Sequence, residues 1–337
     1  MANTLSGTSL GLIIFAKILA MFCVATVGFV LRRRAVFNAE ITSTLSRLLT
    51  DLIFPALVVA KLIDLVSWST LRESGAILAL GGTIMICGGI AAEIYVRIAL
   101  PRASRQTGAF LVAMPNWIFM PLPIVTVLYG ADGIHALLLI NVAMQFLLWT
   151  GGVWMLGRGT SDAHPLVQLR SNRGLQATAI AFLLGLILPA TSSLPDTAFM
   201  HVAIRLGRAI VDGFDMLGSL TVPLTLLIVG AQLGGLTEEH VTDRKALGLV
   251  VIGRLLFVPT VCALVMTALR HFGIFGTTTV QNVSLIVIAM PIAVSSSAFI
   301  DRFGGDIALG ARAIFMSTLG SIFTVPLFVV IVQRIWA

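Results

Sequence analysis

Charge is the scarcest property of this sequence. Only 11% of its 337 residues are charged, whereas about 25% are charged in a typical soluble domain. Apolar residues make up 58%, and the mean hydropathy is +1.01, so a water-soluble globular protein is excluded. A membrane span needs about 20 apolar residues, and ten spans would therefore use roughly 200 positions. We expect an all-α integral membrane protein. The hydrocarbon core offers no hydrogen-bond partners to the backbone, and a helix satisfies its backbone N–H and C=O groups internally.

Signals for metal, cofactor or catalytic chemistry are also missing. Cys23, Cys87 and Cys262 lie in separate apolar runs without CxxC spacing, which indicates small buried side chains. The five histidines fall in or near expected loops without ligand spacing, and no Walker-type phosphate loop occurs. The sequence therefore predicts no cofactor, no metal site, no direct ATP hydrolysis and no enzymatic activity.

The net charge of +7 comes from basic clusters between apolar runs. Such clusters follow the positive-inside rule of membrane proteins, so we do not expect a nucleic-acid partner. The clusters at 32–34, 97–105 and 158–173 fall on one side of the expected topology. This bias predicts a multi-pass protein of the cell (inner) membrane with both termini extracytoplasmic. The run before Arg32 is expected to be a true first span and not a cleaved signal.

Apolar stretches between polar breaks predict ten spans. They lie at about 10–31, 42–66, 75–98, 107–128, 134–157, 174–194, 206–234, 246–269, 278–300 and 310–334.

An internal repeat relates the two halves of the chain. The Ala-Met-Pro of 113–115 recurs at 289–291, the Tyr-Gly-Ala-Asp of 129–132 is echoed by the Phe-Gly-Gly-Asp of 303–306, and Pro55 corresponds to Pro223. Three matches in one order predict duplication of a five-span unit: 1–157, then a cytoplasmic connection at 158–173, then 174–337. Because five is odd, the second unit must be inverted, which is the arrangement of many secondary transporters.

Prolines inside spans 4 and 9 predict interrupted helices. Proline removes a backbone hydrogen bond and clashes with the preceding turn, so Pro115, Pro121 and Pro291 are candidate helix breaks. Two broken helices that cross near the midplane would present free amides and helix ends to a ligand. A simple structural kink remains the alternative.

Uncharged polar side chains surround these breaks. Amides and hydroxyls can hydrogen-bond a carboxylate whose charge helix N-termini balance, although small polar residues also serve tight helix packing. The candidate substrate-binding residues, which include the prolines of both breaks, are Pro115, Asn116, Asn141, Gln145, Pro291, Ser295, Ser317 and Ser321.

Spans 4 and 9 carry no carboxylate before Asp132 and Asp301, which belong to the flanking loops. Three acids elsewhere are candidates for ion coupling or for structural pairing with Lys17, Arg47 or Lys61: Asp51, Asp212 and Asp215. A paired or snorkelling charge near a helix end is the plainer interpretation.

The chain resembles the auxin efflux carrier family of permeases over nearly its whole length. The resemblance rests on a first span that ends in Arg32-Arg33-Arg34, on Phe54-Pro55-Ala56-Leu57, on Pro115-Asn116 with Pro121-Leu122, on Pro223-Leu224 leading to Gly230-Ala231-Gln232-Leu233, on Ala289-Met290-Pro291 followed by Phe303-Gly304-Gly305-Asp306, and on Ser317-Thr318-Leu319 ending at Pro326-Leu327.

The resemblance implies two inverted five-helix repeats with crossing helices 4 and 9, a fold similar to that of bile-acid symporters and NhaA-type antiporters. It implies a scaffold part (helices 1, 2, 6 and 7) and a transport part (helices 3–5 and 8–10) that moves as an elevator. Family substrates are small organic anions, such as auxin or malonate-type dicarboxylates, held beside Pro115, Asn116 and Pro291. Ile292 departs from the family pattern, so only one repeat supplies an asparagine.

We therefore expect a secondary permease that moves a small organic anion by alternating access. The partners are this anion, the lipid bilayer, a proton or sodium as candidate coupling ion, and a second copy in a candidate homodimer through the scaffold. The nearest alternative is a sodium-coupled symporter of the bile-acid type. More remote alternatives are an intramembrane protease, in which Asp306 would be catalytic, and a channel or receptor.

Overall fold

The computed structural model describes residues 7–63, 71–156, 173–187, 198–235, 243–273, 277–303 and 305–336. These residues form helices, and the β pairing among them is one isolated bridge. Six helical stretches in this part of the chain are long and apolar enough to cross a membrane: Ala39–Lys61, Gly75–Ala99, Pro121–Leu156, Arg205–Gly234, Arg244–His271 and Ile307–Trp336. The protein is thus a multi-pass, all-helical membrane protein.

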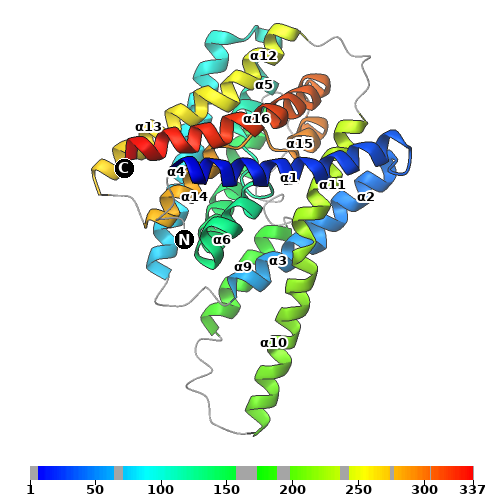
Figure 1. Ribbon diagram of the computed structural model, residues 1–337, viewed down its shortest axis with the longest axis vertical. Helices are drawn as coiled ribbons and strands as arrows, with labels where there is room; N and C mark the ends of the chain where they lie inside the picture. The colour runs from blue at the N-terminus through cyan, green and yellow to red at the C-terminus, as the bar shows by residue number, and fades with distance from the viewer. Residues whose placement is uncertain are drawn as a thin grey trace.

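The first half of the chain contributes seven helices to the part that the structure describes (Figure 1). They are α1 (Gly7–Arg33), α2 (Ala39–Leu48), α3 (Phe54–Leu62), α4 (Leu71–Ala99), α5 (Arg105–Ala113), α6 (Pro121–Leu147) and α7 (Val153–Leu156), with π-helical turns η2 (Leu49–Ile53) and η4 (Leu148–Gly152) and a 3-10 turn η3 (Arg102–Ser104).

The second half contributes eight helices to the described residues. They are α9 (Arg173–Ile187), α10 (Ala198–Ser219), α11 (Thr221–Gly234), α12 (Arg244–Ile252), α13 (Val258–His271), α14 (Thr278–Ala289), α15 (Ser296–Phe303) and α16 (Ile307–Trp336), with the π-helical turn η6 (Gly253–Phe257). Each expected span overlaps at least one helix, while the ten-span inverted topology stays a prediction. The expected connection at 158–173 lies almost wholly outside the described residues.

Two π-helical turns directly precede helices that have a proline as their second residue. η2 leads into α3, whose second residue is Pro55, and η6 leads into α13, whose second residue is Pro259. Proline has no N–H for the helical ladder and its ring crowds the carbonyl four residues earlier. A locally wider turn accommodates both effects, and such turns often lie at functional positions.

One group of helices is built around the close pairing of α1 with α11, with α3, α9 and α10 packed together beside them. Gly230 and Gly234 lie one turn apart on α11 and face α1: a Cβ on Gly230 would overlap the carbonyl oxygen of Ala25, and one on Gly234 would lie 2.8 Å from the carbonyl oxygen of Phe29. Small residues four apart let two membrane helices approach closely. The expected scaffold comprises these helices and α2, and its role as a scaffold stays a prediction.

The second group comprises α4–α7 and α12–α16 and holds most of the buried core. Its most buried segments are on α5, α6 and α14, where Leu111, Ile140 and Ile286 are fully buried. α6 bends at Gly130, whose positive φ of 56° is favourable for glycine; this bend lies at the expected boundary between spans 4 and 5. Figure 1 shows α1 and α16 side by side, where the two groups meet.

Candidate functional site

Two interrupted helices meet in the interior of the molecule. α5 ends at Ala113 and the chain is extended at Met114 before α6 begins at Pro121. α14 ends at Ala289 and the chain is extended at Met290 before α15 begins at Ser296. The repeated Ala-Met-Pro segments thus occupy matching places, each directly at the end of a helix. Pro121 occupies the first position of α6, where proline is well tolerated.

The two extended segments hydrogen-bond each other. The backbone N–H of Asn116 donates to the carbonyl of Pro291 at 2.8 Å, and that of Ala293 donates to the carbonyl of Met114 at 3.0 Å. An antiparallel bridge pairs Pro115 with Ile292. Each break thereby supplies partners for backbone groups that the other leaves outside a helix, which a buried backbone requires.

Ser317 of α16 completes this crossing. Its hydroxyl oxygen accepts from the backbone N–H of Ile292 at 3.3 Å, and the hydroxyl donates to the carbonyl of Ile314 at 3.1 Å. Ser317 is fully buried. Its structural contact is therefore with the backbone of the second break.

A buried arginine lies beside the crossing. Arg254, in η6, is only 1% exposed. Its Nη1 donates to the carbonyl of Val112 at 3.2 Å, and its Nη2 donates to the carbonyl of Ile288. Both carbonyls are next to the last residue of their helices, α5 and α14, where the helix dipoles are negative. The guanidinium thus neutralises two converging helix ends.

Sequence reasoning left Arg254 without a role, although a signal was present. An arginine deep in an expected span is expensive unless it faces the protein interior and has partners, so it marks a functional or structural site by default. Its partners are backbone carbonyls from segments far away in the sequence, which no side-chain pattern reveals.

A cavity of about 230 Å³ adjoins the crossing. We name it the crossing cavity; its lining is mostly apolar and comes from α1, α11, α16 and both breaks: Met21, Phe22, Ala25, Thr26, Phe29, Asn116, Phe119, Met120, Thr225, Leu226, Val229, Leu233, Val294, Phe315, Thr318 and Leu319. It therefore lies between the two groups of helices.

A second, more polar cavity of about 390 Å³ shares Leu233 and Val294 with the crossing cavity. We name it the vestibule; its lining is Arg32, Ala39, Thr42, Ser43, Ser46, Ala231, Gln232, Leu233, Gly235, Val294, Ser297, Ala311 and Ile314. Nη1 of Arg32 donates to the carbonyl of Phe37 at 3.2 Å, which holds the cation near the end of α1. A positive, hydroxyl-rich space thus adjoins an apolar one.

The other polar candidates are distributed around this site. Asn141 is buried, and its carboxamide oxygen accepts from Nε1 of Trp117 at 3.0 Å, one residue beyond Asn116. Gln145 is half-buried, and Ser295 is exposed. Ser321 is buried and donates to the carbonyl of Thr318 at 2.6 Å. Of the candidates, only Asn116 lines the crossing cavity.

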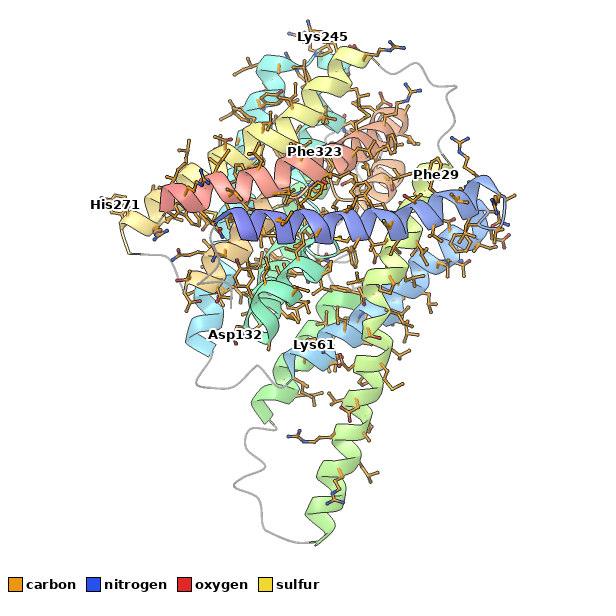
Figure 2. All side chains as sticks on the ribbon, viewed as in Figure 1. Phe29, Lys61, Asp132, Lys245, His271 and Phe323 are labelled. Carbon is orange, nitrogen blue, oxygen red and sulfur yellow. The ribbon has the colours of Figure 1, made fainter. Side chains whose placement is uncertain are left out.

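The three candidate acids line neither cavity. Asp215 of α10 forms an ion pair with Lys61 of α3 at 2.7 Å, with about half of the carboxylate side chain exposed. Figure 2 labels Lys61 on α3 beside α10. Asp51 and Asp212 are exposed, on η2 and α10 respectively.

Asp306 caps a helix. Its carboxylate accepts from the backbone N–H of Leu309 at 2.9 Å in the first turn of α16, and its own N–H donates to Oγ1 of Thr107 at 2.9 Å. This is the ordinary work of an N-cap aspartate. Among the described residues, no group of three or more His, Cys, Asp or Glu side chains is placed to hold a metal ion.

The comparison with protein families covers most of the chain. A family described as membrane transport protein matches residues 13–166 and 166–329. No curated protein matches the chain. The two matched stretches contain both interrupted helices, Arg254 and all the residues that line the two cavities. The chain therefore belongs to the membrane transport protein family, the auxin efflux carrier family that its motifs resemble.

Proposed function

We propose that this protein is a secondary transporter that binds a small organic anion in the crossing cavity. The observation that carries the proposal is the position of this cavity: it lies between the two helix groups, directly at the paired breaks, with the Asn116 side chain in its lining. Membrane transporters commonly bind substrate at such discontinuous helices. Membership of a transport family supports the proposal.

The charge arrangement favours an anion. Met120 precedes α6, and Val294 lies just before α15, so the cavity adjoins two helix N-termini, where the dipole is positive. Arg254 neutralises the opposite, negative ends of α5 and α14. Arg32 adds a positive charge in the vestibule. The net result is a site that attracts a carboxylate without a resident carboxylate of its own.

The apolar lining of the crossing cavity indicates what the uncharged part of the substrate is like. Phe22, Phe29 and Phe119 surround the cavity, together with aliphatic residues of α11. Burial of apolar surface contributes roughly 25 cal/mol per Å². We infer a substrate with a carboxylate and a compact apolar body, which favours the auxin class over the malonate-type dicarboxylates that the family resemblance also implies.

Alternating access would follow from movement of the second helix group against the first. The groups meet through apolar contacts, among them Phe15 with Phe323 at 6.3 Å and Phe54 with Phe119 at 5.6 Å between ring centroids. Apolar contacts have little directional preference, so one surface can slide over the other. We infer an elevator movement that carries the crossing cavity, with the vestibule as its opening on one side.

The sodium-coupled alternative is disfavoured by Arg254. A cation bound where α5 and α14 end would stabilise their negative ends, and the guanidinium already does so. We therefore propose transport without sodium coupling. Uptake in sodium-free medium separates the two hypotheses, since a sodium symporter would stop.

The test uses purified protein in proteoliposomes with radiolabelled malonate and, separately, radiolabelled indole-3-acetate. Saturable uptake of either anion is expected, and Asn116→Ala should abolish it while insertion is unchanged. Thr83→Ala is the matched control, because Thr83 is a half-buried residue that lines neither cavity and whose hydroxyl donates to the carbonyl of Ala79 in its own helix. Full activity of the Asn116 variant would contradict the proposed site. Conductance without saturable flux would instead indicate a channel.

We further propose a homodimer through the scaffold. α10 extends beyond the rest of the molecule in Figure 1, and it exposes apolar side chains along its length, including Leu206, Ile210 and Met216. Disulfide cross-linking of Leu206→Cys in membranes tests this association. The extracytoplasmic placement of both termini is tested by labelling cysteines introduced at Ser6 and Gln333 with an impermeant maleimide.

A further inference from the structure

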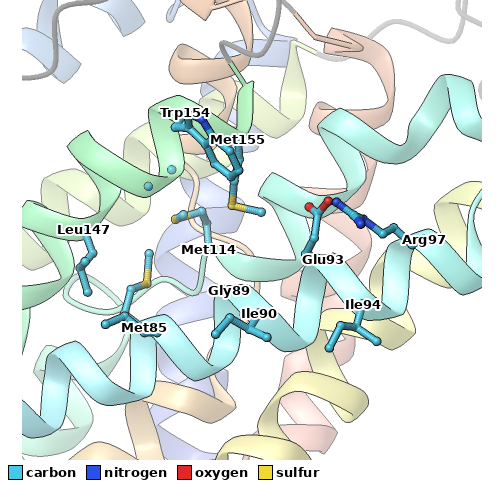
Figure 3. Close-up of a pocket in the computed structure, with 13 residues that line it drawn as sticks. Met85, Gly89, Ile90, Glu93, Ile94, Arg97, Met114, Leu147, Trp154 and Met155 are labelled. Atoms are coloured by element: carbon cyan, nitrogen blue, oxygen red, sulfur yellow. The ribbon is translucent and has the colours of Figure 1, made fainter.

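A further hollow, apart from the crossing cavity and the vestibule, lies on the second group of helices (α4–α7 and α12–α16). It is a groove of about 370 Å³ between α4 and the segment α6–η4–α7. Figure 3 shows Ile90 and Ile94 of α4 on one side and Leu147, Trp154 and Met155 on the other. Ile90, Ile94 and Trp154 are each more than half exposed. The groove is therefore an open, apolar depression on the surface of a membrane protein.

One end of this apolar groove is basic. Glu93 and Arg97 line the groove and also a second hollow of about 330 Å³, which Val96, Arg102, Arg105 and Gln106 complete. Three arginines and one glutamate give this end a net positive charge. The two hollows share Glu93 and Arg97 in their linings. A single elongated surface thus changes from apolar to cationic along α4.

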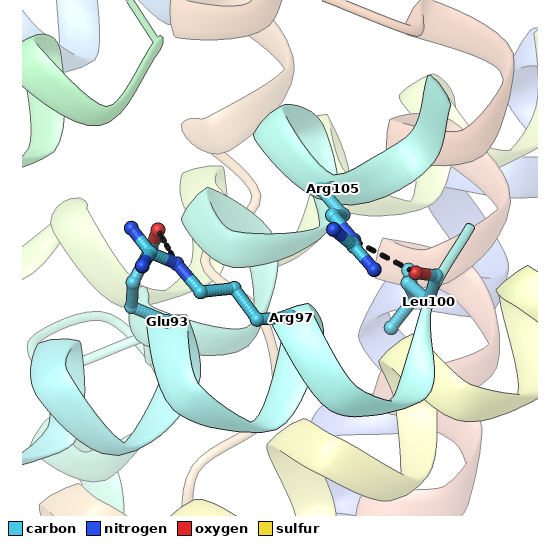
Figure 4. Close-up of polar contacts among 4 residues, drawn as sticks. All are labelled: Glu93, Arg97, Leu100 and Arg105. Carbon is cyan, nitrogen blue, oxygen red and sulfur yellow. Dashed lines mark hydrogen bonds and ion pairs between the residues drawn. The ribbon is translucent and has the colours of Figure 1, made fainter. Parts of the chain in front are cut away.

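Existing contacts orient two of the arginines (Figure 4). Nε of Arg97 bonds Oε1 of Glu93 at 2.8 Å, and Nε of Arg105 donates to the carbonyl of Leu100 at 2.9 Å. A guanidinium has five N–H donors. Both of these bonds are made by Nε and fix the orientation of each guanidinium, whose terminal amino groups are donors of the kind that bind phosphate well.

We propose that this surface is a binding site for one anionic phospholipid, with the phosphate at Arg97, Arg102 and Arg105 and an acyl chain in the groove. The bilayer surrounds this face and supplies such a molecule at high local concentration. Basic pockets between membrane helices on the cytoplasmic side are suited to acidic headgroups. The basic end of α4 lies on the side for which the sequence predicts the cytoplasm. The charge of the hollow and the length of the groove match the two parts of the lipid.

The groove also touches the crossing. The side chain of Met114 lines the groove, while its carbonyl accepts the hydrogen bond from Ala293. An acyl chain in the groove would therefore pack against a residue of the first break. Lipid binding should then stabilise the folded second group of helices by mass action.

The headgroup test measures thermal unfolding of the purified protein in detergent with dioleoylphosphatidylglycerol, with dioleoylphosphatidylcholine, or with inorganic phosphate. Only the anionic lipid is expected to raise Tm. The triple variant Arg97→Gln, Arg102→Gln, Arg105→Gln should lose about tenfold or more of the apparent affinity, because each basic residue near an anionic surface contributes appreciably. Arg244→Gln, a basic residue outside the groove, is the control. An equal effect of phosphatidylcholine or of phosphate on the wild type overturns the proposal, whether or not the variants fold.

The chain test uses two glycines that line the groove. A Cβ on Gly89 or on Gly151 would meet nothing within 4 Å, so a leucine at either position begins in open space and occupies part of the groove. Gly82 of the same helix α4 has equally open surroundings but does not line the groove. Native mass spectrometry should show loss of bound phosphatidylglycerol for Gly89→Leu and Gly151→Leu and retention for Gly82→Leu. Equal retention in all three variants contradicts an acyl chain in the groove.

Discussion

Arg254 donates a hydrogen bond to the backbone carbonyl of Ile288, and so joins a side chain of η6 to the end of α14. The same guanidinium reaches Val112 at the end of α5. One buried cation thereby ties together both interrupted helices of the proposed transport site.

Removal of this cation should destabilise the crossing. Arg254→Gln removes the positive charge that faces the negative ends of α5 and α14. A buried polar group that loses its hydrogen-bond partner lowers the free energy of unfolding by about 1–3 kcal/mol. We expect a lower Tm in detergent, with partial recovery in Arg254→Lys because the charge returns. We also expect sodium to raise the Tm of Arg254→Gln but not of the wild type. A Tm of Arg254→Gln equal to that of the wild type would show that the guanidinium does not hold the crossing.

The prolines of the crossing should act together. Alanine at Pro115 and at Pro291 allows α5 and α14 to extend by helical hydrogen bonds, at the expense of the bridge between Pro115 and Ile292. The double variant should insert in the membrane and lose transport in the proteoliposome assay. Pro326→Ala is the control, because Pro326 lies inside α16 away from both breaks. Wild-type transport by the double variant would contradict the crossing-site hypothesis.

The close pairing of α1 and α11 should depend on glycine at 230. A leucine there would overlap the backbone of Ala25, and overpacking of this kind costs about 1–3 kcal/mol or more. Gly230→Leu should therefore lower Tm and expression level. Gly248→Leu, at an α12 position with open surroundings, should leave both unchanged. If the two variants behave alike, the packing of these helices is not limited by the glycine.

Substitution of the Lys61–Asp215 ion pair tests whether Asp215 has a role in ion coupling or only a structural one. About a third of one side chain and half of the other are exposed, and such pairs contribute at most about 1 kcal/mol. Asp215→Asn should thus have little effect on Tm, and it should retain transport at all pH values tested. The exchanged pair Lys61→Asp, Asp215→Lys should behave like the wild type. Loss of transport in Asp215→Asn, with unchanged Tm and membrane insertion, would instead assign the carboxylate a coupling role.

Much of the architecture followed from local patterns. Apolar runs of the right length predicted membrane helices, and the repeated Ala-Met-Pro segments predicted where two of them are interrupted. These features are local in origin. The length of an apolar run matches the thickness of the bilayer, and a proline removes a backbone hydrogen bond to the preceding turn of its own helix. The family resemblance, carried by the same motifs, agrees with the family that matches the chain.

The sequence by itself determined that the chain is a membrane protein of helices with breaks at Pro115 and Pro291. Only the tertiary structure decided which polar groups meet there. Asn116 lines the crossing cavity, Asn141 instead bonds Trp117, and Arg254 reaches carbonyls 142 and 34 residues away. The physical reason is that spacing along one helix fixes which face a side chain occupies, whereas the packing of helices distant in sequence decides what that face meets.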